Sequence, residues 1–332
     1  VGDTIRLFHV ARNPSLELAT EVNGQWTAAD RDTVGDFSAV AYFFGRRLSR
    51  TLNVPIGLIV SSWGAATAET WTDGATLAGL GKFTPPEAVP EASPQRTPTL
   101  LFNGMINPLI GYGLRGAIWY QGEGNVDRAQ AHEALIGGMV NSWRAKWGLG
   151  PFPFYYAQIA PFDYGKRGNS AFLREAQLKT MKSLENSGMA VLLDIGLENY
   201  IHPREKIAVG DRLANWALAK TYDVPGIEYA GPILREVKPG KEGELVLHFD
   251  HTPNGISSFG KPLTGFMVAG EDRVFHPAEA KIQREAGVLM LKSAEVPHPV
   301  AARYAFENWV EATLFSTAGL PASSFRTDDW EK

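Results

Sequence analysis

The chain has 332 residues, which is enough for a large α/β domain with a smaller appended region. Its 32 basic and 36 acidic residues are interspersed and give a net charge of -4, so the sequence lacks the basic footprint that binds nucleic acid or anionic membranes. No apolar stretch reaches the roughly 20 residues that span a bilayer. The absence of cysteine excludes disulfides, thiolate metal sites and a cysteine nucleophile.

Predicted strands and helices alternate along the first two thirds of the chain. The predicted strands span 5–10, 55–60, 116–120, 154–160 and 189–195. The predicted helices span 37–52, 131–147, 170–183 and 206–221. The segment 11–36 is polar and turn-rich, and 72–98 reads as a long loop with at most one short helix. This alternation predicts an α/β domain over 1–230 with a doubly wound parallel sheet.

The sequence pattern changes from about residue 231 onward. Short apolar runs separated by Gly, Pro and Asp, at 244–249, 263–269 and 288–291, indicate antiparallel strands. We therefore expect a small β-rich region over 231–332 that packs on the first domain.

Polar residues follow three of the predicted strands. They are Ser61, Ser62 and Gly64 after the second strand, Gln121 and Glu123 after the third, and the segment 194–202, which ends in His202, after the last. The carboxyl ends of parallel strands meet at one edge of a sheet, where ligands bind. A hydroxyl, an amide, a carboxylate and an imidazole are the groups that nucleophilic acyl transfer needs.

A less specific interpretation exists for each of these residues. Gln121 and Glu123 could be solvated loop residues, since loops commonly carry such side chains. His202 is favoured over the other six histidines because it follows an apolar strand and precedes Pro203 and a helix.

The order of the motifs is specific. They are IRLFHV, FSAVAYFFGR, GLIVSSWGAATAETW, LFNGMINPL, GAIWYQGEGN, NSWRAKWG with PFYYAQIAPF, DIGLENYIHPREK with VGDRLANWAL, and GLPASSFRTDDW. In this order, from about residue 5 to residue 330, the chain resembles the sialate O-acetylesterase family. That family is a branch of the SGNH hydrolases acting on acetylated carbohydrates.

The resemblance implies an SGNH-type fold, a serine-type acyl-enzyme mechanism and no metal or cofactor. It implies that the backbone N–H of Gly64 and the side-chain amide of Gln121 form the oxyanion hole, and that His202 is the general base. The family's other positions near the site, without individual roles, correspond here to Asn103, Tyr120, Glu123 and Asn125.

The chain departs from the family pattern in two places. Ala65 stands where the family has a second glycine after SSWG. The nucleophile of the family lies in a GQSNM motif upstream of IRLF, and the chain contains no GQS. We expect the nucleophilic serine on a separate N-terminal fragment, since a central strand could not be omitted without leaving unpaired backbone groups. The alternative is that Ser62, or less favourably Ser61, attacks the ester.

The acid that orients His202 is also open. SGNH enzymes often place an Asp three residues before the histidine, where this chain has Asn199. The remaining candidates are Asp194, Glu198 and Glu123.

The sequence therefore predicts a carbohydrate O-acetylesterase, of sialate or xylan type, whose partner is an acetylated carbohydrate. One alternative is a non-catalytic carbohydrate-binding protein in which Trp63, Trp71, Trp119 and Tyr120 stack on sugar. A second is a glycosidase using Glu69 and Glu123. The residues from Val1 onward show no charged region followed by an apolar run, so only the family resemblance leads us to expect a secreted or periplasmic location.

Overall fold

The computed structural model describes residues 4–81, 83–283 and 287–330, and divides into two compact units. Unit 1 comprises Val1–Gln158, Ala176–Ala190 and Glu205–Ile227. Unit 2 comprises Ile159–Glu175, Val191–Arg204 and Glu228–Lys332. Two segments that the sequence pattern places in the first domain, 159–175 and 191–204, thus belong to unit 2.

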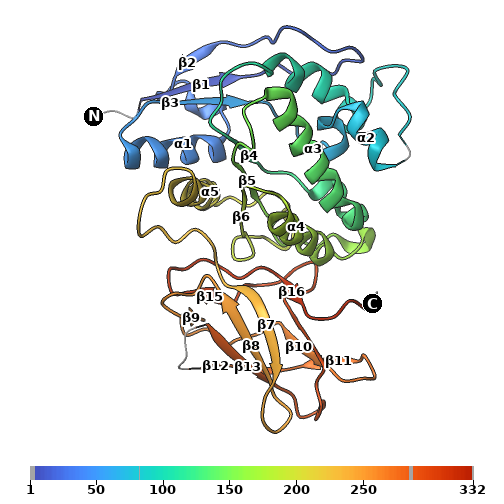
Figure 1. The fold of residues 1–332 in the computed structure, drawn as a ribbon, viewed down its shortest axis with the longest axis vertical. Coiled ribbons are helices and arrows are strands. Elements are labelled where there is room, and N and C mark those ends of the chain that lie inside the picture. Colours follow the sequence, from blue (N-terminus) through green and yellow to red (C-terminus); the bar gives the residue numbers. More distant parts are fainter. Residues whose placement is uncertain (1–3, 82, 284–286, 331–332) are drawn as a thin grey trace. The chain divides into compact units, whose positions relative to one another are not determined.

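The helices lie close to their predicted positions (Figure 1). They are α1 (Ala39–Leu52), α2 (Gly74–Leu80), α3 (His132–Trp147), α4 (Ala171–Ser183) and α5 (Lys206–Lys220). The side chain of Ser38 caps α1 by accepting a hydrogen bond from the Ala41 N–H, which would otherwise lack a partner in the first turn. Gly148 ends α3 in the left-handed conformation, with φ of 67°, as predicted from its position.

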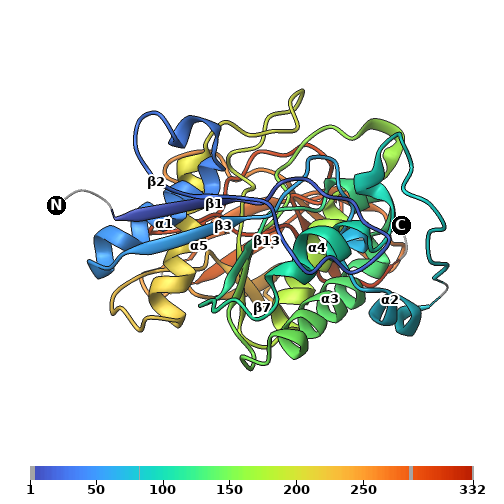
Figure 2. The same ribbon diagram turned by 90° about the horizontal axis from the view of Figure 1, so that it is seen from above.

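The first sheet of unit 1 has the order β2-β1-β3, with strands β1 (Ile5–His9), β2 (Trp26–Ala28) and β3 (Ile56–Val60). Strands β1 and β3 run parallel and lie side by side in both views (Figures 1 and 2). Their buried side chains Ile5, Leu7 and Leu58 form a core on which Phe44 of α1 packs. A β-α-β unit thus forms at the start of the chain, as the alternating pattern predicts.

The second sheet of unit 1 has the order β4-β5-β6, with strands β4 (Ala117–Trp119), β5 (Phe154–Ala157) and β6 (Ser187–Ala190), all parallel. Within the described residues the parallel pairs thus lie in two sheets, since β1 pairs with β3 in the first, where β2 is antiparallel, and β4 with β5 and β5 with β6 in the second. The doubly wound arrangement stays a prediction. The apolar run 189–195 is also strand only up to Ala190, because a turn follows in which the Ile195 N–H donates to the Leu192 carbonyl (3.2 Å).

Helices α1 and α5 pack against each other at short range. Gly210 makes this possible, since a Cβ atom at that position would lie 2.7–2.9 Å from atoms of Phe43, Phe44 and Val40. Both helices also border the cavity described below.

Unit 2 is built from short antiparallel strands, as the change of pattern near residue 231 predicts. Its sheets have the orders β11-β10-β14-β16, β12-β13-β8-β7 and β15-β9. The strands are β7 (Ile233–Pro239), β8 (Leu245–Asp250), β9 (Ile256–Ser257), β10 (Phe266–Ala269), β11 (Phe275–Pro277), β12 (Glu279–Ile282), β13 (Val288–Lys292), β14 (Ala301–Tyr304), β15 (Phe315–Ser316) and β16 (Phe325–Arg326). Leu193 belongs to the core of this unit, together with Leu247, Leu289 and Tyr304.

Candidate active site

Gln121 lies just beyond the end of β4, where the strand pattern places it. The residue is only 9% exposed. The Nε2 atom donates to Asn125 Oδ1 at 2.7 Å and to the Ala66 carbonyl at 3.2 Å. The amide therefore links the loop after β4 to the loop after β3, and both of its hydrogens have acceptors within unit 1.

Asn125 fixes the orientation of that amide. Its Nδ2 atom lies 3.0 and 3.2 Å from the two carboxylate oxygens of Glu69, and an ionised carboxylate only accepts hydrogen bonds. Oδ1 must then face the donors, which are the Ala68 N–H at 3.0 Å and Gln121 Nε2. The remaining atom, Gln121 Oε1, is buried with no hydrogen-bond partner among the described residues.

Glu69 connects this network to a basic and an imidazole side chain. Arg128 Nε lies 3.3 Å from the Glu69 carboxylate. Burial lowers the pKa of His132 to about 4, and the negative charge of Glu69 opposes that shift in part. His132 is therefore neutral at pH 7, and its Nδ1 atom has no partner in the described part of the chain.

Tyr120 and Glu123 lie on either side of Gln121 in the chain, and both interact with Lys206. The sequence patterns do not single out this lysine. Lys206 Nζ lies 5.3 Å from the centre of the Tyr120 ring. Burial lowers the pKa of Lys206, and the charge of Glu123 acts in the opposite direction. Lys206 is the first residue of α5 and follows the IHPRE motif directly, which is the signal that could have identified it.

The segment after β3 holds the two candidate serines in different environments. Ser61 is half-buried, and its hydroxyl donates to the Met105 carbonyl at 3.0 Å. Ser62 and Gly64 are exposed. Trp63 is half-buried, with the Arg12 guanidinium 5.1 Å from its ring centre. The roles predicted for Ser62, Gly64 and Trp63 stay predictions.

Ala65 adopts the left-handed conformation with φ of 61°. A Cβ atom is strained in this region by about 1–2 kcal/mol, whereas glycine is not. Glycine therefore suits this position better than alanine. The methyl group of Ala65 is accommodated at the cost of this backbone strain.

Asn103 and Asn125, both predicted to lie near substrate, are buried. The Asn103 amide donates to the carbonyls of Ser15 (3.1 Å) and Leu16 (2.8 Å) and so holds the segment before β2. Both side chains therefore position other parts of unit 1, and their contact with substrate stays a prediction.

One of the four aromatic residues considered as a sugar platform, Trp71, belongs to the core and is 3% exposed. Trp119 packs edge-on against both Trp71 and Trp143, with ring centres about 6 Å apart. This cluster extends to Phe154. Trp63, Trp119 and Tyr120 are each half-buried, and of these Trp119 is held within the aromatic cluster.

His202 lies in unit 2, in the segment 191–204, and is exposed. Its ring meets that of Tyr200 edge-on at 5.8 Å. Of the acids predicted to orient it, Glu198 accepts a hydrogen bond from the Asp163 N–H at its backbone carbonyl (3.0 Å). The pKa of Tyr304 is raised mainly by burial and further by the charge of Asp194. The approach of His202 to Gln121 stays a prediction.

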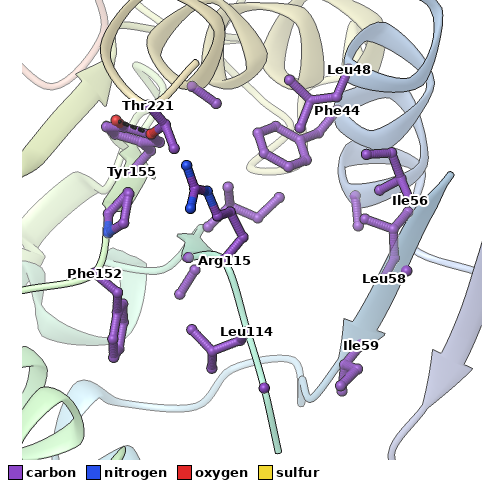
Figure 3. Close-up of a pocket in the computed structure, with 18 of the residues that line it drawn as sticks. Phe44, Leu48, Ile56, Leu58, Ile59, Leu114, Arg115, Phe152, Tyr155 and Thr221 are labelled. Carbon is purple, nitrogen blue, oxygen red and sulfur yellow. Dashed lines mark hydrogen bonds between the residues drawn. The ribbon is translucent and has the colours of Figure 1, made fainter. Parts of the chain in front are cut away.

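A cavity of about 520 Å³ lies within unit 1 (Figure 3). Its walls include β3 and the chain from Leu114 to Trp119, with Phe44 and Leu48 of α1 and Thr221 just beyond α5. Tyr155 and Thr221 are joined by a hydrogen bond of 2.8 Å at its border. Arg115 is the only charged residue among those that line it.

Among the described residues, no group of three or more His, Asp or Glu side chains could hold a metal ion. No helix in the same residues has the length and apolar character needed to cross a membrane.

Comparison with known protein families identifies the family of this chain. The sequence profile described as "Carbohydrate esterase, sialic acid-specific acetylesterase" matches residues 8–219. The chain belongs to this family. It therefore groups with carboxylic ester hydrolases, as the motif order predicts.

Named relatives are similar over most of the chain. Sialate O-acetylesterase of Mus musculus is 27% identical over 97% of this chain and 71% of its own length, and that of Homo sapiens is 30% identical over 67% and 47%. A crystal structure of a carbohydrate acetylesterase from Xanthomonas citri has 35% identity and a TM-score of 0.90, covering 98% of this chain and 74% of that one. The matched part thus spans about half of the human protein and about three quarters of the bacterial structure.

The buried His132 of this esterase-family chain predicts a pH-dependent stability. Its folded pKa of about 4 lies below the ordinary 6.5, so the unfolded chain binds a proton first as pH falls. Between pH 7 and pH 4 this group should remove about 3 kcal/mol of unfolding free energy. Chemical denaturation of the wild type and of His132→Gln, which does not titrate, measures the difference. Equal losses in both proteins would contradict the assignment.

The left-handed Ala65 predicts a stabilising substitution. Ala65→Gly should raise the unfolding free energy by about 1 kcal/mol, because glycine adopts φ of 61° without strain. The neighbouring Ala66→Gly is the control and should lower it by about 0.5–1 kcal/mol, since Ala66 lies outside the left-handed region. Denaturant titration gives both values, and a destabilised Ala65→Gly variant would refute the explanation.

Proposed function

We propose that this protein hydrolyses O-acetyl esters of carbohydrates by a serine-type mechanism with an acyl-enzyme intermediate. The observation that carries the proposal is the fixed side chain of Gln121 at the end of β4, in a chain that belongs to an acetylesterase family. An amide held rigidly by a carboxylate through a second amide is a preorganised dipole, as transition-state stabilisation requires.

In this mechanism a serine hydroxyl oxygen attacks the acetyl carbonyl carbon and passes its proton to His202. The oxyanion is stabilised by the Gly64 N–H and by Gln121, whose longer bond, to Ala66, is the one that the oxyanion replaces. His202 then returns the proton to the leaving sugar oxygen. Water, deprotonated by His202, attacks the acyl-enzyme and releases acetate and the free serine.

The acid partner of His202 is one of Asp194, Glu198 and Glu123. Asp194 and Glu198 share unit 2 with His202, whereas Glu123 lies in unit 1 beside Lys206. Tyr120 and Trp63, both half-buried, are the aromatic side chains proposed to contact the sugar.

The nucleophile is proposed to lie on a segment outside these 332 residues, as in the family pattern. Ser62→Ala should then leave the turnover of an acetylated sugar within about twofold. Ser61→Ala is the comparison, because its hydroxyl has a structural partner in the Met105 carbonyl. Loss of turnover in Ser62→Ala alone, with no second polypeptide detected by intact mass spectrometry, would assign the acyl group to Ser62.

The general base gives the most direct test of the esterase mechanism. His202→Ala should reduce the turnover of an acetylated sugar by several orders of magnitude, since the imidazole moves the proton in every step. His298→Ala is the matched control, because His298 is likewise exposed in unit 2. Full activity in His202→Ala would refute the mechanism. Equal inactivity of wild type and both variants towards p-nitrophenyl acetate, with sugar binding retained, would favour the non-catalytic binding protein.

The oxyanion role of Gln121 predicts a specific kinetic signature. Gln121→Ala should lower kcat by about 100- to 1000-fold with little change in KM, as for other oxyanion donors. Gln130→Ala is the control, because Gln130 lies exposed on the helical segment Glu123–Ala131 that follows Gln121. A change confined to KM would show that Gln121 binds the ground-state sugar.

A further inference from the structure

We propose that Glu69 is a positioning residue for the esterase reaction. Its carboxylate, acting through Asn125, sets the spacing between the two predicted oxyanion donors, the Gly64 N–H and the Gln121 amide. The inference rests on the proposed function, because the two donors have a common task only if the protein hydrolyses an ester. It goes beyond that function by assigning a role to a carboxylate that acts through another side chain.

The loop after β3 and the loop after β4 are joined by several contacts. Gln121 Nε2 donates to the Ala66 carbonyl at 3.2 Å, and the Ala68 N–H donates to Asn125 Oδ1 at 3.0 Å. Gly124 allows this close approach, because a Cβ atom at that position would lie 2.9 Å from the Ala66 oxygen. The loops that carry the two donors are therefore in contact through both backbone and side-chain atoms.

Glu69 completes this contact from the side of the β3 loop. Its two carboxylate oxygens lie 3.2 and 3.0 Å from Asn125 Nδ2. Its backbone is fixed as well, since its carbonyl accepts from the N–H groups of Thr72 (3.2 Å) and Thr99 (3.1 Å). A carboxylate anchored in this way holds the side chain of Asn125, a residue that is 1% exposed, in one orientation and at one distance.

The charge of Glu69 is balanced where it lies. Arg128 Nε is 3.3 Å from the carboxylate, and the Glu69 side chain is 23% exposed. A negative charge close to a developing oxyanion would oppose its formation, and a neighbouring cation and water both weaken that repulsion. Asn125 is neutral, so it passes the orientation on to Gln121 without placing a charge beside it.

The spacing of the donors matters because each donor must lie about 2.7–3.1 Å from the oxyanion. A small shift of one loop therefore weakens one of the two bonds. A Cβ atom at Gly64 would meet nothing within 4 Å, so this donor has open space beside it. The next residue, Ala65, is in the left-handed conformation, which persists only where surrounding contacts hold it. The contacts of Gln121 and Asn125 with the β3 loop are of this kind.

An exchange of chemistry between two positions tests the proposal on the complete enzyme, including the segment that carries the nucleophile. Asn125→Asp sets two carboxylates against each other, and Glu69→Gln sets two amides against each other. Each should lower kcat for an acetylated sugar at least about tenfold at pH 8, with KM within about threefold of wild type.

The double variant with both changes restores the pairing. The new amide at position 69 donates to the new carboxylate at position 125, whose other oxygen still accepts from Gln121. Its kcat should therefore return to within about threefold of wild type. Glu87→Gln is the control, because Glu87 is an exposed carboxylate of unit 1, and it should leave kcat unchanged.

A spectroscopic measurement tests the orientation separately from turnover. The side-chain NH₂ signals of Gln121 in an NMR spectrum are identified by their loss in Gln121→Ala. They should shift in Glu69→Gln, although Asn125 lies between the two side chains, and return towards their wild-type positions in the double variant. Glu87→Gln should leave them in place.

Three results would overturn the proposal: single variants that keep the wild-type kcat, a double variant no more active than the single ones, or losses that appear in KM and not in kcat. A structural role alone would lower the unfolding free energy, measured by denaturant titration, without this split between kcat and KM. Absence of turnover in the wild type would refute the proposed function instead, and the NH₂ signals would then decide whether Glu69 orients Gln121.

Discussion

The pairing of backbone N–H and C=O groups along parallel strands is the constraint on which unit 1 depends. It joins β1 to β3, β4 to β5 and β5 to β6, and thereby sets where each strand ends. The polar residues that follow β3 and β4 are placed by these ends, since the chain can turn only where the ladder stops. The same constraint gives the cavity its character, because its two walls are the sides of β3 and β4 that no described strand pairs.

A second ordering principle acts on the side chains after β4. Two amides in contact could each be oriented in either direction, since the nitrogen and oxygen of an amide have nearly the same shape. Glu69 removes this ambiguity, because its carboxylate can only accept and therefore selects the nitrogen of Asn125. That choice passes on to Gln121. The Glu69 carboxylate, which contacts Gln121 only through Asn125, thus decides which atom of Gln121 has no hydrogen-bond partner among the described residues.

The sequence predicted most elements correctly, and its errors have physical causes. The helix at 39–52 and the turn at Gly148 were identifiable because amphipathic spacing and a terminal glycine are local signals. The run 189–195 was misjudged beyond Ala190, because Leu193 is apolar for another reason: it packs into the core of unit 2. Asn103 and Asn125 could be placed near the site, but residue type alone does not reveal whether an amide meets a ligand or a carbonyl of its own chain.

The sequence by itself determined the α/β character, the antiparallel region that follows it, the family and the positions of Gln121 and His202 along the chain. These depend on hydrophobic period, turn residues and motif order, all of which are local or linear properties. Only the tertiary structure decided that the parallel strands form two sheets, that Lys206 lies over Tyr120, and that segments 159–175 and 191–204 belong to unit 2. These depend on which distant backbone and side-chain groups satisfy one another, and contacts between residues far apart in the chain leave no periodic trace in the sequence.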